Sequence, residues 1–131
     1  MIETDFDHAE MFPYAISIAK RRGAQRILVG EPRLRSSSGN KWIVPDVLGI
    51  RDSMFIIVEC EKSHGNIFDE GGKLHSWSLQ TEIFESCELH FILRGNAFYR
   101  RDKIREYFGD RPNLFVYRFE ELIKEVTPIV L

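Results

Sequence analysis

Three carboxylates stand in segments of the chain that are otherwise apolar. Asp46 precedes the run "VLGI", and Glu59 and Glu61 end the run "MFIIVECE". An ionised carboxylate in an apolar strand is costly unless a positive group pairs with it. Neighbouring carboxylates also raise each other's pKa. The sequence therefore predicts a positive partner at this place, and a divalent cation is the simplest one.

The spacing of these residues predicts how they face one another. Residues two apart in an extended strand point the same way, so Glu59 and Glu61 project together and Cys60 points to the other side. Antiparallel pairing across the short turn "RDS" could bring Asp46 beside Glu59. Such oxygen ligands suit Mg²⁺ or Mn²⁺, and the backbone carbonyl of Cys60 could add another oxygen. A metal held there could activate water and stabilise charge on a phosphate.

Helices and strands alternate along the chain in a way that predicts an α/β fold. Apolar residues from Phe12 to Ala19 follow helical spacing, Gly23 is expected to end that helix, and Pro13 either lies in its first turn or kinks it. Strands are predicted over 26–34, 41–50, 54–61, 88–94 and 113–119. Further helices are predicted over 63–87, interrupted by Gly71 and Gly72, and over 98–109 and 120–126.

The element order αβββαβαβα sets the expected sheet. The opening strands should form an antiparallel meander, and the later strand–helix–strand units can add parallel strands. Strand 54–61 is apolar on both faces, which suits a central position, whereas Pro45 implies an edge or bulge in strand 41–50. We therefore expect a mixed central sheet flanked by helices.

The residues and this order resemble the PD-(D/E)XK nuclease superfamily. Pro45–Asp46 lies thirteen positions before Glu59 of "ECEK", and the αβββαβ opening is similar to the restriction-endonuclease-like core over roughly the first three quarters of the chain. Within the superfamily the likeness is to archaeal Holliday-junction resolvases. The resemblance implies a Mg²⁺- or Mn²⁺-dependent endonuclease acting on DNA, including branched DNA. It further implies that Asp46 and Glu59 bind the metal and that Glu61 lies in the site.

The chain departs from the superfamily at the motif lysine. Glu61 stands where that lysine is usual, which resembles the E-x-E variant of some restriction endonucleases, where the second Glu serves as a base or as a further ligand. Lys62 or Lys73 could supply the missing positive charge, with Gln80 a weaker candidate. Lys62 is slightly preferred, since a strand that ends at Glu61 could let its side chain swing back. Relatives sometimes supply the lysine from the following helix, as Lys73 would, but Lys73 is interpreted as a surface lysine beside the Gly-Gly break.

A first-helix glutamate often helps to bind the metal in this superfamily. Glu10 is the matching residue here, and Glu31 is the less suitable substitute.

The polar turn after the first predicted strand is the expected contact with DNA phosphates. It combines cations with hydroxyl groups, and its candidates, with one residue past the third strand, are Arg33, Arg35, Ser36, Ser37, Ser38, Lys41 and His64. Lys20–Arg22 and the cluster Arg100, Arg101, Lys103 and Arg105 could widen this surface. Trp42 and Trp77 are interpreted as core or rim aromatics rather than as base-stacking platforms. A homodimer would suit cleavage of two strands, because two-fold symmetry provides two equivalent sites.

Two other interpretations remain open. Cys60, His64, His75 and Cys87 invite a zinc site, but their spacing fits no compact zinc pattern, and nothing suggests the exposed thiolate that a Cys–His nucleophile needs. The chain could also be a nuclease-fold module that binds nucleic acid or regulates without catalysis. The near-neutral charge and Glu61 favour that alternative.

Length and composition bound these hypotheses. The chain has 131 residues, expected to form one domain over 1–131, and a formal net charge of −2, which gives no bulk attraction to nucleic acid. The start "MIETDFDH" is acidic and lacks the apolar run of a signal peptide, and no apolar stretch is long enough to span a bilayer. Two cysteines make no disulfide framework, so a reducing cytoplasm is expected.

Overall fold

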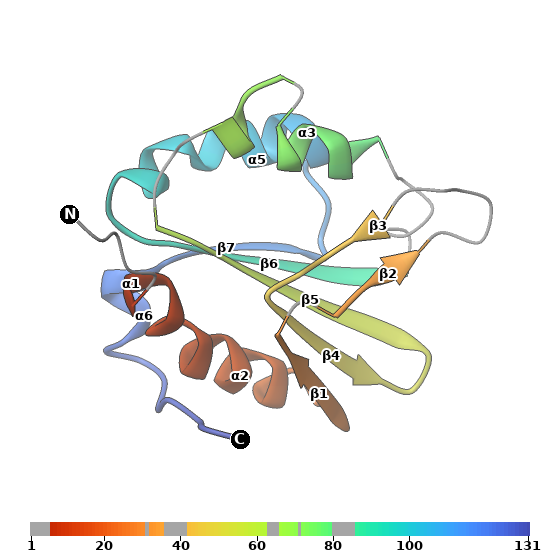
Figure 1. Cartoon of the computed structure of the whole chain (residues 1–131), viewed down its shortest axis with the longest axis vertical. Helices are drawn as coiled ribbons and strands as arrows, with labels where there is room; N and C mark the ends of the chain where they lie inside the picture. The colour runs from red at the N-terminus through yellow and green to blue at the C-terminus, as the bar shows by residue number, and fades with distance from the viewer. Residues whose placement is uncertain (1–5, 31, 36–41, 63–65, 71, 80–85) are drawn as a thin grey trace.

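A five-stranded mixed sheet forms the centre of the fold (Figure 1). The computed structural model describes residues 6–30, 32–35, 42–62, 66–70, 72–79 and 86–131. The sheet has the order β1-β4-β5-β6-β7, and its strands are β1 (Arg26–Val29), β4 (Val47–Arg51), β5 (Met54–Glu61), β6 (Cys87–Leu93) and β7 (Leu114–Arg118). Strands β1, β4 and β5 pair antiparallel, whereas β6 and β7 add parallel strands. The predicted α/β class, the antiparallel opening and the central place of strand 54–61 are confirmed.

The first two predicted strands are each broken in two, so the expectation of two long strands was wrong. Between β1 and the short β2 (Leu34–Arg35), Gly30 adopts a left-handed φ of +92°. Between β3 (Trp42–Ile43) and β4, Pro45 has no amide hydrogen to donate to a neighbouring strand. As a result β2 and β3 form a separate two-stranded hairpin outside the main sheet.

Helices cover both faces of the sheet, as Figure 1 shows. On one face lie α1 (Phe6–Ala9), α2 (Phe12–Arg21) and α6 (Phe119–Leu122). On the other lie α3 (Lys73–Ser78) and α5 (Arg101–Phe108), each preceded by a 3-10 segment, η1 (Asn66–Phe68) and η2 (Gly95–Arg100). Pro13 lies in the first turn of α2, and Gly23, with a φ of +89°, follows its end. Both expectations for this helix are therefore confirmed.

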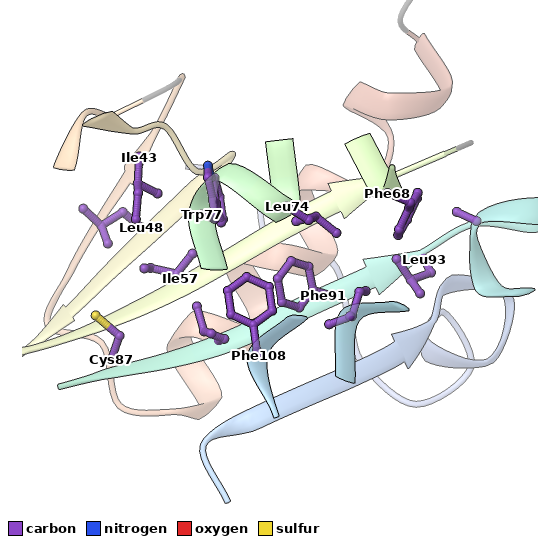
Figure 2. Close-up of a cluster of buried hydrophobic side chains, with 13 residues drawn as sticks. Ile43, Leu48, Ile57, Phe68, Leu74, Trp77, Cys87, Phe91, Leu93 and Phe108 are labelled. Atoms are coloured by element: carbon purple, nitrogen blue, oxygen red, sulfur yellow. The ribbon is translucent and has the colours of Figure 1, made fainter. Parts of the chain in front are cut away.

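Side-chain alternation on the central strands separates two hydrophobic cores. Ile56, Val58 and Cys60 face α2, whereas Ile57 faces α3 and α5. Figure 2 shows the second core, in which Leu74 and Trp77 of α3 and Phe108 of α5 cover the sheet. Glu59 and Glu61 alternate with Cys60, so they project toward the α3 face of the sheet.

Two further features concern the chain as a whole. Both cysteines are free thiols. Within the ranges that the structure describes, no helix combines the length and the apolar character needed to cross a membrane.

Candidate functional site

Asp46 and Glu59 lie side by side where β4 begins and β5 ends. The antiparallel register pairs Val47 with Val58, so the residues just beyond are opposite each other. The backbone amide of Asp46 donates to Glu59 Oε2 at 3.1 Å, and the amide of Cys60 donates to Asp46 Oδ2 at 2.8 Å. Both side chains are buried, Glu59 almost completely. The predicted juxtaposition of the two carboxylates is confirmed, and backbone amides fix their orientation.

Lys73 supplies the positive charge at this cluster, which corrects its interpretation as a surface lysine. Its Nζ donates a hydrogen bond to Glu59 Oε1 and lies 5.0 Å from the centroid of the Trp77 ring. Lys73 is the first residue of α3, and α3 is held on this face by Leu74 and Trp77 in the core. Lys62, the slightly preferred candidate, lies in a bend just after β5. The lysine that the structure shows at Glu59 Oε1 is Lys73, on the helix that follows.

His8 is a site residue that the sequence analysis missed. Its Nε2 lies 2.8 Å from the carbonyl oxygen of Cys60 and 3.3 Å from Asp46 Oδ2. A carbonyl oxygen only accepts, so Nε2 must carry the proton. The ring packs edge-on against Phe12, with centroids 5.0 Å apart. The four-residue spacing of His8 and Phe12 was the one signal that could have placed them on a common face.

Glu10, the predicted first-helix metal ligand, is exposed and contacts Arg94, so its role as a ligand stays a prediction. It lies in the turn between α1 and α2, and Arg94 Nη1 contacts its Oε2 at 3.2 Å. The first helix ends at Ala9, and that turn directs Glu10 toward Arg94 while His8 takes the inward position. Among the remaining candidates, these lie outside the described residues: Glu31, Ser36, Ser37, Ser38, Lys41, His64 and Gln80.

The cluster carries more negative than positive charge. Burial raises the pKa of Glu59 well above its usual range; the Lys73 ammonium counteracts this shift, and the charges of Asp46 and Glu61 add to it. Burial likewise raises the pKa of Glu61, although its hydrogen bond with Glu59 counteracts the shift. Two carboxyl groups can share a hydrogen bond only when one is protonated. The single Lys73 ammonium therefore does not balance the three carboxyl groups, Asp46, Glu59 and Glu61.

The Glu59 carboxylate acts on Lys73 in turn. Burial disfavours the charged ammonium, but Glu59 outweighs burial and raises the pKa of Lys73. Lys73 is thus held as a cation at neutral pH.

The donor set is compatible with a hard cation, although protein groups now fill its central positions. Asp46 Oδ2 and the Cys60 carbonyl oxygen converge on one point, since His8 Nε2 contacts both. These oxygens and the two Glu carboxylates are the ligands that Mg²⁺ and Mn²⁺ prefer. Across the described part of the chain, however, no three His, Cys, Asp or Glu side chains form a ready-made metal cluster. A cation would therefore compete with the His8 and Lys73 contacts.

A cavity of about 450 Å³ opens beside the carboxylates. It is bounded by the β2–β3 hairpin on one side and α3 on the other, and its lining residues are Trp42, Val44, Asp46, Lys73, Ser76 and Trp77. Trp77 is a core residue, whereas Trp42 lies at the rim with 46% of its surface exposed. Both tryptophans thus occupy the expected kinds of position.

The predicted basic residues divide between this cavity and other surfaces. Arg33 and Arg35 lie on the hairpin, with their guanidinium carbons 6.0 and 5.4 Å from the Trp42 ring centroid. Arg22 of the "KRR" cluster instead donates to Glu88 on the α2 face. Lys103 and Arg105 pair with acidic residues of their own helix. The hairpin arginines accordingly lie beside Trp42, a residue that lines the cavity.

The zinc alternative does not fit the geometry. Cys60 packs in the core under α2, whereas Cys87 packs in the core under α3 and α5, so the sheet separates them. Burial raises the pKa of both thiols, that of Cys87 to about 12. Neither thiol is therefore suited to metal binding or nucleophilic attack at neutral pH.

Comparison with known proteins adds no relative to this geometry. No protein-family model matches the chain, and no curated protein or solved structure is significantly similar to it.

Proposed function

We propose that the chain is a metal-dependent nuclease that hydrolyses phosphodiester bonds in DNA. The observation that carries the proposal is the buried pair Asp46 and Glu59, with Lys73 Nζ on Glu59 and a cavity open beside them. Clustered buried acids are costly, and acids of perturbed pKa in a cleft are candidates for a functional site. The resemblance of "PD…ECEK" to nuclease motifs supports the same chemistry.

Asp46, Glu59 and the Cys60 carbonyl would hold a divalent cation, with Glu61 as a further ligand or a base. When bound, the cation supplies a Lewis acid for the phosphate and makes water a stronger nucleophile at neutral pH. Lys73 then has the role of the missing motif lysine: its ammonium orients the attacking water and offsets charge on the phosphate oxygens. In its ionised form, Glu61 would accept the proton that the water loses.

The test is a cleavage assay with Mg²⁺ and with Mn²⁺. Supercoiled plasmid, linear duplex, single strand and four-way junction are each incubated with the wild type, Glu59→Ala and Lys73→Met. Glu106→Gln serves as the control, because Glu106 lies on α5 and pairs with Lys103 at the surface. We expect metal-dependent cutting that both site variants lose and Glu106→Gln keeps. Cutting that survives Glu59→Ala, or that needs no metal, contradicts the proposal.

One observation favours a second candidate, a nuclease-fold module that binds nucleic acid without cutting it. Protein groups already occupy the carboxylate oxygens, since Lys73 and His8 contact Glu59 and Asp46. The two candidates differ in their response to metal. The nuclease should gain thermal stability on addition of Mg²⁺ alone and lose that gain in Asp46→Ala. A melting temperature that does not respond to Mg²⁺ or Mn²⁺, together with intact substrates, would favour the module.

A further inference from the structure

One face of the β2–β3 hairpin combines an aromatic ring with two cations. Arg35 pairs with Trp42 across the hairpin, and Leu34 pairs with Ile43. Leu34 and Ile43 pack against the core, so alternation directs Arg35 and Trp42 to the opposite face, with Arg33 two residues from Arg35. The guanidinium carbons of Arg33 and Arg35 lie within 6.0 Å of the Trp42 ring centroid.

This chemistry matches a nucleotide better than an apolar partner. An exposed indole offers a π face on which any base can stack, and arginine offers charge to a neighbouring phosphate. Trp42 is 46% exposed, whereas Trp77 on the facing wall is buried. The ring that is available for stacking is therefore on the hairpin wall of the cavity.

Trp42 lies next to the proposed reacting centre. Trp42 and Val44 line the same cavity of about 450 Å³ as Asp46 and Lys73. A base stacked on Trp42 would thus place its own phosphate near the carboxylate cluster. In a duplex, bases present only their edges, because their faces are covered by neighbouring pairs. A base can stack on Trp42 only when it is unpaired or turned out of the helix.

We propose that Trp42, with Arg33 and Arg35 on its ring, is a stacking platform for an unpaired base, so that the substrate is a DNA strand with an unpaired nucleotide beside the scissile bond. The conclusion about the substrate rests on the proposed nuclease function, whereas the stacking of a base on Trp42 can be measured without cleavage. It narrows the substrate from DNA in general to single-stranded or locally unpaired DNA.

The first experiment measures binding in EDTA, where no divalent cation is present. Fluorescein-labelled oligo(dT) of 12 nucleotides and a 12-base-pair duplex are titrated with the wild type, Trp42→Ala, Trp42→Phe and Tyr99→Ala. Tyr99 is the matched control, because it is an exposed aromatic residue on η2, outside the cavity lining. Thermal melts of each variant establish that it is folded.

We expect the wild type to bind the strand about tenfold more tightly than the duplex. Trp42→Ala should weaken strand binding by about tenfold or more, as loss of one stacked base does elsewhere. Trp42→Phe should keep most of the affinity, and Tyr99→Ala should keep all of it. Oligo(dT) should also quench tryptophan fluorescence in the wild type but not in Trp42→Phe, where only buried Trp77 remains.

Failure of the platform and failure of the nuclease give different results. Equal affinity for strand and duplex, no measurable strand binding, or equal effects of Trp42→Ala and Tyr99→Ala overturn the platform. A nuclease that cuts duplex and strand at the same rate, unaffected by Trp42→Ala, overturns the platform while the nuclease stands. Tight, Trp42-dependent strand binding with no cleavage of any substrate supports the platform and overturns the nuclease.

Discussion

Lys73 and His8 make the contacts that offset the free-energy cost of burying the carboxylate cluster. Asp46 and Glu59 are buried, and Glu61 adds a third acid beside them. Lys73 donates a hydrogen bond to Glu59, and His8 Nε2 contacts Asp46 Oδ2 and the Cys60 carbonyl oxygen. Without a metal, these two donors stand where positive charge is required. Their removal should therefore affect stability as well as any catalysis.

The first prediction concerns Lys73→Ala in the metal-free protein. We expect the free energy of unfolding at pH 7 to fall by about 1–3 kcal/mol, because buried Glu59 loses its ammonium partner. Urea denaturation measures the change. The control is Lys103→Ala, which breaks an exposed pair with Glu106 and should cost less than about 0.5 kcal/mol. Equal losses in the two variants would show that the Lys73–Glu59 contact contributes no more than a surface pair.

The sequence predicted the strand residues of the site but not those that reach it from elsewhere. Alternation along β5 was sufficient to place Glu59 and Cys60 on opposite faces, and a short turn was sufficient to bring Asp46 alongside. Lys73 and His8 come from segments whose position depends on packing against the sheet. No local pattern reports that packing, so Lys62, adjacent in sequence, was preferred over Lys73.

Among the elements, β4 lies in close contact at Gly49 with the end of α2 and the residues that follow it. A Cβ atom at residue 49 would lie 2.9 Å from the Cβ of Ala24 and 3.3 Å from the Cβ atoms of Ala19 and Ile56. The glycine that follows the "PD" motif therefore has a packing role. It lets the end of α2 lie against β4, and β4 in turn presents Asp46 to β5.

The second prediction concerns Gly49→Ala. Overpacking of this kind costs about 1–3 kcal/mol, whereas the lower entropy of the unfolded chain returns only about 0.4–1 kcal/mol. We expect a net destabilisation, measured by urea denaturation. The double variant Gly49→Ala, Ala24→Gly removes the closest contact and should recover part of the loss. An unchanged or raised stability for Gly49→Ala alone, or strictly additive effects in the pair, would contradict this account of the packing.

The class and order of the elements could be predicted from sequence, whereas their ends could not. Apolar periodicity identified all five main strands and the helix that precedes them. The break of two predicted strands into β1, β2, β3 and β4 depends on Gly30 and Pro45, which interrupt pairing without interrupting the apolar pattern. The resulting hairpin contributes Trp42 to the wall of the cavity, so the strand that was predicted wrongly borders the candidate site.

On the scale of the whole molecule, a second set of titratable groups lies on the sheet face opposite the carboxylate cluster. Arg22 donates to both oxygens of Glu88, at 2.8 and 3.0 Å. His90 Nε2 donates to Glu88 Oε1 at 2.9 Å, and Tyr117 donates to His90 Nδ1 at 2.9 Å. This pattern satisfies a neutral His90. Alternation of Glu88 and His90 in an apolar strand was the available sequence signal, of the same kind as that for Glu59 and Glu61.

The two faces respond to pH with opposite signs. The hydrogen bond from Arg22 lowers the pKa of Glu88 from 4.5 to about 2, so its contribution to stability is lost as pH falls from 4.5 toward 2. Burial lowers the pKa of His90 below 6.5, so stability is also lost as pH falls below 6.5. Burial raises the pKa of Glu59 and Glu61 above 4.5, so their contribution is full below 4.5 and is lost as pH rises.

The third prediction follows from these opposing slopes and is measured as the free energy of unfolding against pH in metal-free buffer. Because Arg22 is half-exposed and partly screened, we expect Glu88 to account for a loss of about 1–3 kcal/mol between pH 4.5 and 2. Glu88→Gln should flatten that acid limb, and Glu61→Gln should instead reduce the loss on raising pH toward neutrality. An acid limb that is unchanged in Glu88→Gln would place the acid sensitivity elsewhere. Slopes that change together in both variants would mean that the two faces do not titrate independently.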